Sequence, residues 1–290
     1  MRRLKGTLLI CVLPAFVYVV IVCFVPLFLA LRMSFSEQIG GENVFVGLSH
    51  YTRLLYDKVF WQITAQTFYF AGFSVLLHFS IGLLFALLLN QRIKYRDLWR
   101  GLQAIPWLFP AAVTGCIWIF IFQPQYGLLN SILFRLNLSH LAQDWLGQTN
   151  LALTSVTIAN SWTFFSFFTL MFLAAMQNIP REAYEAAAID GAGSWSRFWY
   201  VTLPNLKPIM FTLCLLDFIW TFRFFDLTWI MTKGGPVRSS EILPTYVYKT
   251  AFHNFDYHRA AAIGAAMMIF LLPFTLWYLK LYRSSLERGT

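Results

Sequence analysis

One apolar stretch of the chain carries polar and aromatic residues on a single helical face. The residues of this face are spaced at i, i+3, i+4 and i+7: Asp217, Trp220, Thr221 and Phe224. Carboxylates and hydroxyls can hydrogen-bond to rows of hydroxyl groups, and aromatic rings can stack on rings of C–H groups. A face that offers both residue types predicts a binding site for a polyhydroxylated molecule.

A second apolar stretch repeats this pattern earlier in the chain, with Asn160, Thr163, Phe164 and Phe167. For each aromatic residue, ordinary packing between helices is an equally good explanation. That alternative is weaker for Asp217, because burying a carboxylate without a partner is energetically costly. We therefore expect Asp217, followed by Asn160 and Trp220, to contribute most to the site.

Two further ionisable residues lie within apolar segments. Arg223 precedes Asp226 by three residues, so the two can form an ion pair along one helix. The alternative is that Arg223 contacts an anionic group of a ligand. His78 is alone among Phe and Leu residues, where a histidine is more often a hydrogen-bonded packing residue than a ligand.

The sequence contains no recognisable catalytic arrangement. It lacks a phosphate-binding GxxxxGK[ST] run, an HExxH motif, a GxSxG motif and a cluster of His and carboxylate residues at metal-ligand spacing. Each of the four cysteines lies inside an apolar run, and none has paired spacing, which argues against a disulfide or metal framework. We expect no catalytic residue, no metal and no cofactor in this chain.

The composition is typical of a protein that crosses a membrane several times. Hydrophobic residues make up 58% of the 290 residues and charged residues only 12%, about half the share in soluble domains. The net charge of +9 comes from short basic runs beside apolar segments, where anionic lipid head groups can neutralise it. We therefore expect membrane lipid, and not nucleic acid, to lie against these basic residues.

The apolar runs predict an all-α protein with six transmembrane helices in a single domain, residues 1–290. The first run follows a basic N-terminus and is too long for a secretory signal, so it predicts a retained helix. The expected spans are 7–33, 66–90, 102–122, 151–176, 207–231 and 260–279.

The distribution of Lys and Arg predicts the orientation of these spans. Basic residues are dense near the N-terminus, in the turn 92–100, in the segment 178–208 and after the last span, and are sparser in the longer loops on the other side. Basic residues favour the cytoplasmic side of a membrane. We expect both termini and the segment 178–208 to be cytoplasmic.

The segment 178–208 is a polar island between two apolar runs, and its pattern is that of two short helices. Asn178 and Pro180 suit the start of one helix, Gly191 suits its end, and Ser194 suits the start of a second helix. An amphipathic hairpin that lies on the lipid surface would show similar features. Seven positions at fixed spacing give the segment a more specific pattern: Glu185, Ala186, Ala187, Gly191, Val201, Leu203 and Pro204.

This pattern resembles the EAA loop of permease subunits in binding-protein-dependent ABC importers, in which the residue at Val201 is Ile. The segment FVGLSHYTRLL resembles sugar permeases, and MTKGGP and YVYKTAF resemble, in this order and spacing, carbohydrate permeases of the maltose and glycerol-phosphate type. Together these resemblances extend over nearly the whole chain. They imply a type I ABC importer transmembrane domain in a bacterial inner membrane.

The resemblance also implies partners and roles. In the family, the EAA loop couples the permease to two ATP-binding subunits, which hold ATP and Mg. The implied coupling residues are Glu185, Ala186, Ala187 and Gly191. A second, different permease and an extracytoplasmic solute-binding protein complete such an importer, and the helices before and after the loop line its transport path. The chain itself is then not an enzyme.

Two other classes of membrane protein are the alternatives. A self-contained ion-coupled carrier or channel should show intramembrane carboxylates on several helices or paired interrupted helices. In this chain the intramembrane charges are confined to the segment 207–231. An intramembrane enzyme requires a nucleophile or metal ligands at suitable spacing, which the sequence does not contain.

Overall fold

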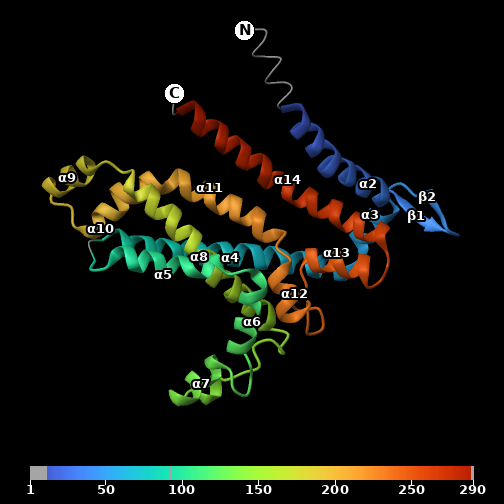
Figure 1. The fold of residues 1–290 in the computed structure, drawn as a ribbon, viewed down its shortest axis with the longest axis horizontal. Coiled ribbons are helices and arrows are strands. Elements are labelled where there is room, and N and C mark those ends of the chain that lie inside the picture. The colour runs from blue at the N-terminus through green and yellow to red at the C-terminus, as the bar shows by residue number, and fades with distance from the viewer. Residues whose placement is uncertain (1–11, 92, 289–290) are drawn as a thin grey trace, which may run out of the picture. The chain divides into compact units, whose positions relative to one another are not determined.

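The computed structural model describes residues 12–91 and 93–288, with side chains up to residue 282, and is built almost entirely of helices (Figure 1). Five of these helices are long and apolar enough to cross a membrane: Val12–Ser34, Lys58–Asn90, Ala152–Gln177, Ser194–Phe222 and Tyr257–Tyr282. A sixth crossing results if the bent pair Arg96–Leu108 and Ala111–Ile121 forms one span. The predicted helical membrane architecture is confirmed.

The chain forms two compact units. The described part of the first unit comprises 12–61 and 246–270. It contains a helix with the π-helical turn η1 (Val20–Phe24), the helices α2 (Val25–Ser34) and α3 (Ser49–Tyr56), and the antiparallel strands β1 (Ser36–Ile39) and β2 (Glu42–Phe45). The end of α13 (Leu243–Phe252) and the beginning of α14 (Tyr257–Arg288) also belong to it.

Polar side chains join the elements of this first unit. Arg259 donates hydrogen bonds to the carboxylate of Asp57 at 2.7 Å and to the hydroxyl of Tyr246 at 3.0 Å. Arg53 donates two hydrogen bonds to the carboxylate of Glu37, at 3.0 and 3.3 Å. Arg53 lies on α3 and Glu37 on β1, so this pair joins the hairpin to the following helix.

The second unit comprises Gln62–Thr245 and the end of α14. Its elements in chain order are α4 (Lys58–Asn90, from Gln62 on), α5 (Arg96–Leu108), α6 (Ala111–Ile121), α7 (Leu128–Arg135), η2 (Ser139–Leu141), α8 (Ala152–Gln177), α9 (Arg181–Ile189), α10 (Ser194–Arg197), η3 (Phe198–Thr202), α11 (Leu203–Phe222) and α12 (Asp226–Thr232). The predicted spans 66–90 and 260–279 lie inside α4 and α14, and 151–176 agrees with α8 to within one residue.

Helix α8 lies at the centre of this unit and buries more of its length than any other described span. Its hydroxyl side chains are accommodated because they bond to carbonyls one turn back: Thr157 to Leu153 at 2.8 Å, and Thr169 to Phe165 at 3.0 Å. Helix α4 approaches α8 closely at Gly82. A Cβ atom at that position would lie 2.5 Å from the Cβ of Phe168.

The third predicted span, 102–122, is not one continuous helix. Helix α5 ends at Leu108, α6 begins at Ala111, and the two axes differ by 96°. Pro110 has no amide hydrogen to donate, and it drives the residue before it, Phe109, into an extended conformation (φ −74°, ψ 134°). In Figure 1, α6 leads away from α5 at this break. Pro110 lies within the predicted span 102–122, whereas in the structure it separates two helices.

The fifth predicted span, 207–231, is also divided. Helix α11 begins at Leu203 and ends at Phe222, and α12 begins at Asp226. The amide of Phe224 bonds to the carbonyl of Thr221 at 3.0 Å, which closes a tight turn at the end of α11. Arg223 and Asp226 are therefore not on one helix, and among the described residues neither has an ion-pair partner. The predicted ion pair between them is wrong.

Candidate functional site

The segment 178–208 forms the predicted pair of short helices, α9 and α10, which continue through η3 into α11. Asn178 ends α8, and Pro180 occupies the position just before α9, one residue earlier than a first-turn proline. We call the part from α9 to η3 the elbow. Tyr184 on α9 and Thr202 on η3 lie in hydrogen-bond contact, with 3.0 Å between their hydroxyl oxygens. This contact holds α9 against the start of the next long helix.

The bend of the elbow depends on Gly191. The amide of Gly191 bonds to the carbonyl of Ala188 at 3.1 Å, and the amide of Ala192 bonds to the carbonyl of Ala187 at 2.9 Å. These two bonds are those of a Schellman motif, whose central residue must adopt a left-handed conformation. Gly191 has φ +77°, and a Cβ atom there would meet nothing within 4 Å. Glycine is therefore required by the backbone conformation and not by lack of space.

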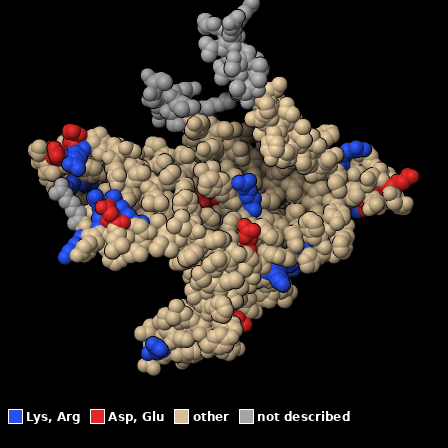
Figure 2. Space-filling view, in the orientation of Figure 1, with Lys and Arg blue, Asp and Glu red and all other residues tan. Residues whose placement is uncertain are grey.

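The elbow presents an accessible surface. Glu185 and Ala186 are exposed, Ala187 is half-buried, and Ile189 at the end of α9 is 87% exposed. In Figure 2, charged side chains gather at the end of the second unit where α9, α10 and the start of α5 lie, beside largely uncharged helices. A charged surface with an exposed apolar residue at its edge is suited to contact another protein.

The predicted aromatic residues of α8 meet those of α11 and of the turn that follows it. Phe164 contacts Phe224 edge to face with 5.5 Å between ring centroids, and Phe167 contacts Trp220 at 5.9 Å. Trp220 remains 40% exposed, whereas the other three rings are half-buried. The structure therefore brings the four predicted aromatic residues together in two pairs and leaves the indole of Trp220 accessible.

The predicted polar residues of α8 and α11 are buried. Thr163 bonds to the carbonyl of Ala159 at 3.3 Å, and Thr221 lies 3.5 Å from a carboxylate oxygen of Asp217. Asn160 is fully buried, and neither atom of its amide has a hydrogen-bond partner within the described part of the chain. A buried amide without partners is unusual, so Asn160 retains its full capacity to bind water or a ligand.

Asp217 has a partner that sequence analysis did not identify. Its carboxylate lies 2.7 Å from Nδ1 of His78 on α4, and both side chains are at most 4% exposed. The rings of Phe164 and Phe168 flank the imidazole at 5.7 and 5.8 Å. The pair joins α4 to α11 across an apolar interior. Asp217 is thus oriented toward His78, and the hydrogen bond occupies the oxygen nearest the histidine.

Arg223 lies at the end of α11 with its side chain exposed. None of the hydrogen bonds or ion pairs among the described residues involves its guanidinium group. An arginine without a partner next to half-buried aromatic residues can bind an anionic group.

The comparison with known families decides the identity of this fold. Residues 78–285 match the model of the binding-protein-dependent transport system inner membrane component. The chain belongs to this family. It is therefore a permease, the membrane-spanning subunit of an importer that depends on a binding protein, and the resemblance seen in the elbow is confirmed.

Individual relatives extend over most of the permease. The trehalose/maltose transport system permease protein MalF of Thermococcus litoralis is 35% identical over 275 residues, which are 94% of this chain and 92% of the relative. The sulfoquinovosyl glycerol transport system permease protein SmoG of Agrobacterium fabrum is 32% identical over 251 residues, which are 87% of this chain and 81% of the relative.

The fold also matches a solved structure. A chain of a bacterial ABC transporter that imports the acidic polysaccharide alginate superposes with a TM-score of 0.85 and 22% sequence identity, covering 97% of the permease and 96% of that chain. The permease therefore has the transmembrane fold of type I ABC importers, as predicted.

Proposed function

We propose that the permease is one transmembrane half of an ATP-driven importer that carries a carbohydrate or sugar derivative. Two relatives more than 30% identical are named for trehalose/maltose and for sulfoquinovosyl glycerol, which supports this substrate class. The observation that carries the proposal is the exposed elbow, whose Schellman bend at Gly191 coincides with the glycine of the EAA pattern.

The elbow is proposed to couple the permease to an ATP-binding subunit. Glu185 and Ala186 present a carboxylate and a small side chain to the partner, Ala187 supports them, and Gly191 sets the direction of the chain that follows. Two such subunits hold ATP and Mg, and this chain holds neither. A second, different permease completes the pore, and an extracytoplasmic solute-binding protein delivers the substrate.

In this proposal residues 1–290 act as one transmembrane domain of the inner membrane. Both termini and the elbow face the cytoplasm, because the basic residues around the elbow favour that side. The orientation places the elbow where a soluble ATP-binding subunit can reach it.

The coupling role is tested by Gly191→Leu. A residue with a side chain loses about 1–2 kcal/mol in the left-handed conformation, so α9 should shift although nothing lies within 4 Å of the new Cβ atom. Gly193→Ala is the matched control, because Gly193 has φ −69° and open space around it. In the reconstituted importer we expect Gly191→Leu to lose sugar uptake and the stimulation of ATP hydrolysis by the binding protein, and Gly193→Ala to keep both. Normal uptake and stimulation in Gly191→Leu would contradict the proposal.

The sugar path is proposed to run along the contact between α8 and α11. The accessible indole of Trp220 offers a surface for stacking, and the unpartnered amide of Asn160 offers hydrogen bonds. Phe164, Phe167 and Phe224 shape this contact, and the hydroxyls of Thr163 and Thr221 lie behind it. One carboxylate oxygen of Asp217 is paired with His78, and the other oxygen, 3.5 Å from the hydroxyl of Thr221, is proposed to contact the sugar.

Arg223 is proposed to contact an anionic group of the substrate, because its expected partner Asp226 lies beyond the helix break and the two are not paired. Replacing Arg223 by Gln removes the charge and keeps a hydrogen-bonding side chain. We expect Arg223→Gln to reduce uptake of an acidic sugar about tenfold or more and to leave uptake of a neutral sugar unchanged, since a charge-assisted bond contributes about 1.5–3 kcal/mol. Equal effects on both sugars would rule out a role in charge recognition.

A further inference from the structure

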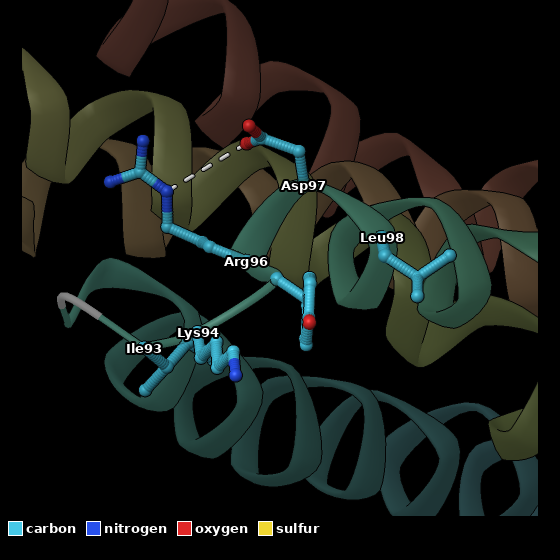
Figure 3. Close-up of a pocket in the computed structure, with 6 residues that line it drawn as sticks. Ile93, Lys94, Arg96, Asp97 and Leu98 are labelled. Carbon is cyan, nitrogen blue, oxygen red and sulfur yellow. Dashed lines mark ion pairs between the residues drawn. The ribbon is translucent and has the colours of Figure 1, made fainter.

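The connection between α4 and α5 forms an open basic pocket outside the proposed sugar path. It has a volume of about 770 Å³ and is lined by residues 93–98. Figure 3 shows Lys94 and Arg96 extending to different sides of this connection, with Asp97 facing Arg96. Lys94 lies 5.1 Å from the centre of the Tyr95 ring. Two cationic side chains and an exposed aromatic ring therefore border the same opening.

The positive charge of this pocket is only partly neutralised. Asp97 is the nearest carboxylate to two arginines, at 3.7 Å from Nε of Arg96 and 3.6 Å from Nη1 of Arg100. Both distances exceed those of hydrogen bonds. The guanidinium of Arg96 has no hydrogen-bond acceptor within the described part of the chain. An anion in the pocket would find donors already oriented and largely unpaired.

An apolar groove of about 420 Å³ adjoins the basic pocket and shares Ile93 with it. The groove lies between α4 and α5, and its principal lining residues are Leu88, Leu89, Trp99, Leu102, Pro106 and Phe165. From Trp99 to Pro106 it follows α5 for about 10 Å, at 1.5 Å per residue. That length is about two-thirds of one leaflet of the hydrocarbon core.

One polar side chain lies in this groove. Gln103 is 8% exposed, and neither its amide nitrogen nor its amide oxygen has a partner among the described residues. It follows Arg100 by one turn of α5, just inside the basic rim. In a phospholipid the ester carbonyls lie just below the phosphate. If the phosphate lies at the basic rim, the amide of Gln103, one helical turn further along α5, lies at the level of an ester carbonyl.

We propose that this pocket and groove bind one anionic phospholipid. Lys94 and Arg96 flank its head group from the two sides of the connection, Gln103 donates a hydrogen bond to an ester carbonyl, and one acyl chain occupies the groove along α5. The charge complementarity selects an anionic head group. Trp99 and Tyr95 lie at the junction of the polar and apolar parts, where amphipathic rings are favoured in a membrane.

A lipid fits the groove better than a soluble protein does. The groove leads away from the basic rim along α5, the first helix of the bent pair, where a soluble ATP-binding subunit has no access if that pair spans the membrane. The proposal rests on the cytoplasmic orientation proposed above, because it places the phosphate at the basic end of α4 and α5. Its test needs no ATP hydrolysis or transport, so its failure is distinguishable from a failure of the importer function.

The first test is lipid binding to the purified importer in detergent, measured by native mass spectrometry. The probes are dioleoyl phosphatidylglycerol and dioleoyl phosphatidylcholine, which differ in charge and share their acyl chains. We expect the wild type to prefer phosphatidylglycerol, and the double variant Lys94→Gln/Arg96→Gln to lose about tenfold to thirtyfold in affinity for it. The matched control Arg135→Gln/Lys233→Gln, which removes two exposed charges elsewhere, should keep the preference.

Three results would overturn the proposal. These are equal binding of the two lipids by the wild type, an unchanged preference in the Lys94→Gln/Arg96→Gln variant, or displacement of phosphatidylglycerol by inorganic phosphate. The last result would indicate a free-anion site without a role for the groove. Leu102→Trp, which fills the groove, should weaken binding of both lipids, and full binding by this variant would also contradict the proposal.

A second measurement identifies the occupant in the membrane. A photoreactive residue in place of Leu98, which is exposed at the rim, should form an adduct with phospholipid in the assembled importer. A crosslink to the second permease or to an ATP-binding subunit, without a lipid adduct, would show that protein covers the pocket and would refute the proposal.

Discussion

The buried pair of His78 and Asp217 gives the sharpest quantitative prediction for the helix packing. The atoms that pair lie 2.7 Å apart, and both side chains are almost fully enclosed. Replacing Asp217 by Leu should leave Nδ1 of His78 without an acceptor, which costs about 1–3 kcal/mol. Replacing His78 by Phe should leave a carboxylate buried without its partner, which costs about 3–5 kcal/mol.

The double variant His78→Phe/Asp217→Leu should lose less stability than the sum of the two single variants. Its phenyl ring would lie between Phe164 and Phe168, which already flank the imidazole. Hydrogen bonds between membrane helices reach at most about 1.7 kcal/mol in double-mutant cycles. Because this bond is short and one partner is ionisable, we expect a coupling energy of about 1.5 kcal/mol, close to a tenfold change in the folded-to-unfolded ratio.

The coupling can be measured by unfolding the permease in mixed micelles with increasing denaturing detergent and following the loss of helical signal. A control cycle combines His78→Phe with Asp226→Leu. Asp226 lies on α12, and within the described residues no hydrogen bond or ion pair joins it to His78, so this cycle should be additive. A coupling energy within about 0.3 kcal/mol of zero for His78 and Asp217 would refute the reasoning. Sugar uptake by the double variant addresses function, because retained uptake would remove Asp217 from direct substrate contact.

Three other predictions follow from local geometry. Gly82→Ala should destabilise the permease by about 1–3 kcal/mol in the same assay, because the new Cβ atom would lie 2.5 Å from the Cβ atom of Phe168. The control Gly72→Ala lies on the same helix with open space around the new Cβ atom, so it should be neutral or stabilising. Trp220→Ala should weaken apparent sugar affinity about fivefold or more with normal ATP-binding subunit assembly; an unchanged affinity would place the sugar path elsewhere. The hydrogen bonds from Arg53 hold the pKa of Glu37 below 4.5, so their stabilising effect is present above pH 4.5 and is lost as the pH falls through the lowered pKa. Arg53→Gln should return the pKa of Glu37 toward 4.5 in a carbon NMR titration. An unchanged pKa would contradict this cause.

The sequence alone determined the features that depend on local chemistry. Long apolar runs predict membrane spans because the backbone must satisfy its hydrogen bonds within the bilayer, and α4, α8 and α14 lie where these runs predict. The bend at Gly191 was predictable because a helix end in the left-handed conformation favours glycine. The helical spacing of Phe164 and Phe167 likewise predicted residues that share one face.

The tertiary structure alone decided which distant side chains meet. His78 and Asp217 are separated by 139 residues, so their spacing carries no signal, although each buried ionisable group required some partner. The helix breaks after Leu108 and Phe222 turn α6 away from α5 and separate Arg223 from Asp226. The sequence did not predict these breaks, because hydropathy reports the length of an apolar run and not whether the helix is continuous. The groove beside Gln103 arises from the packing of α4, α5 and α8, and packing between helices depends on contacts that no single segment encodes.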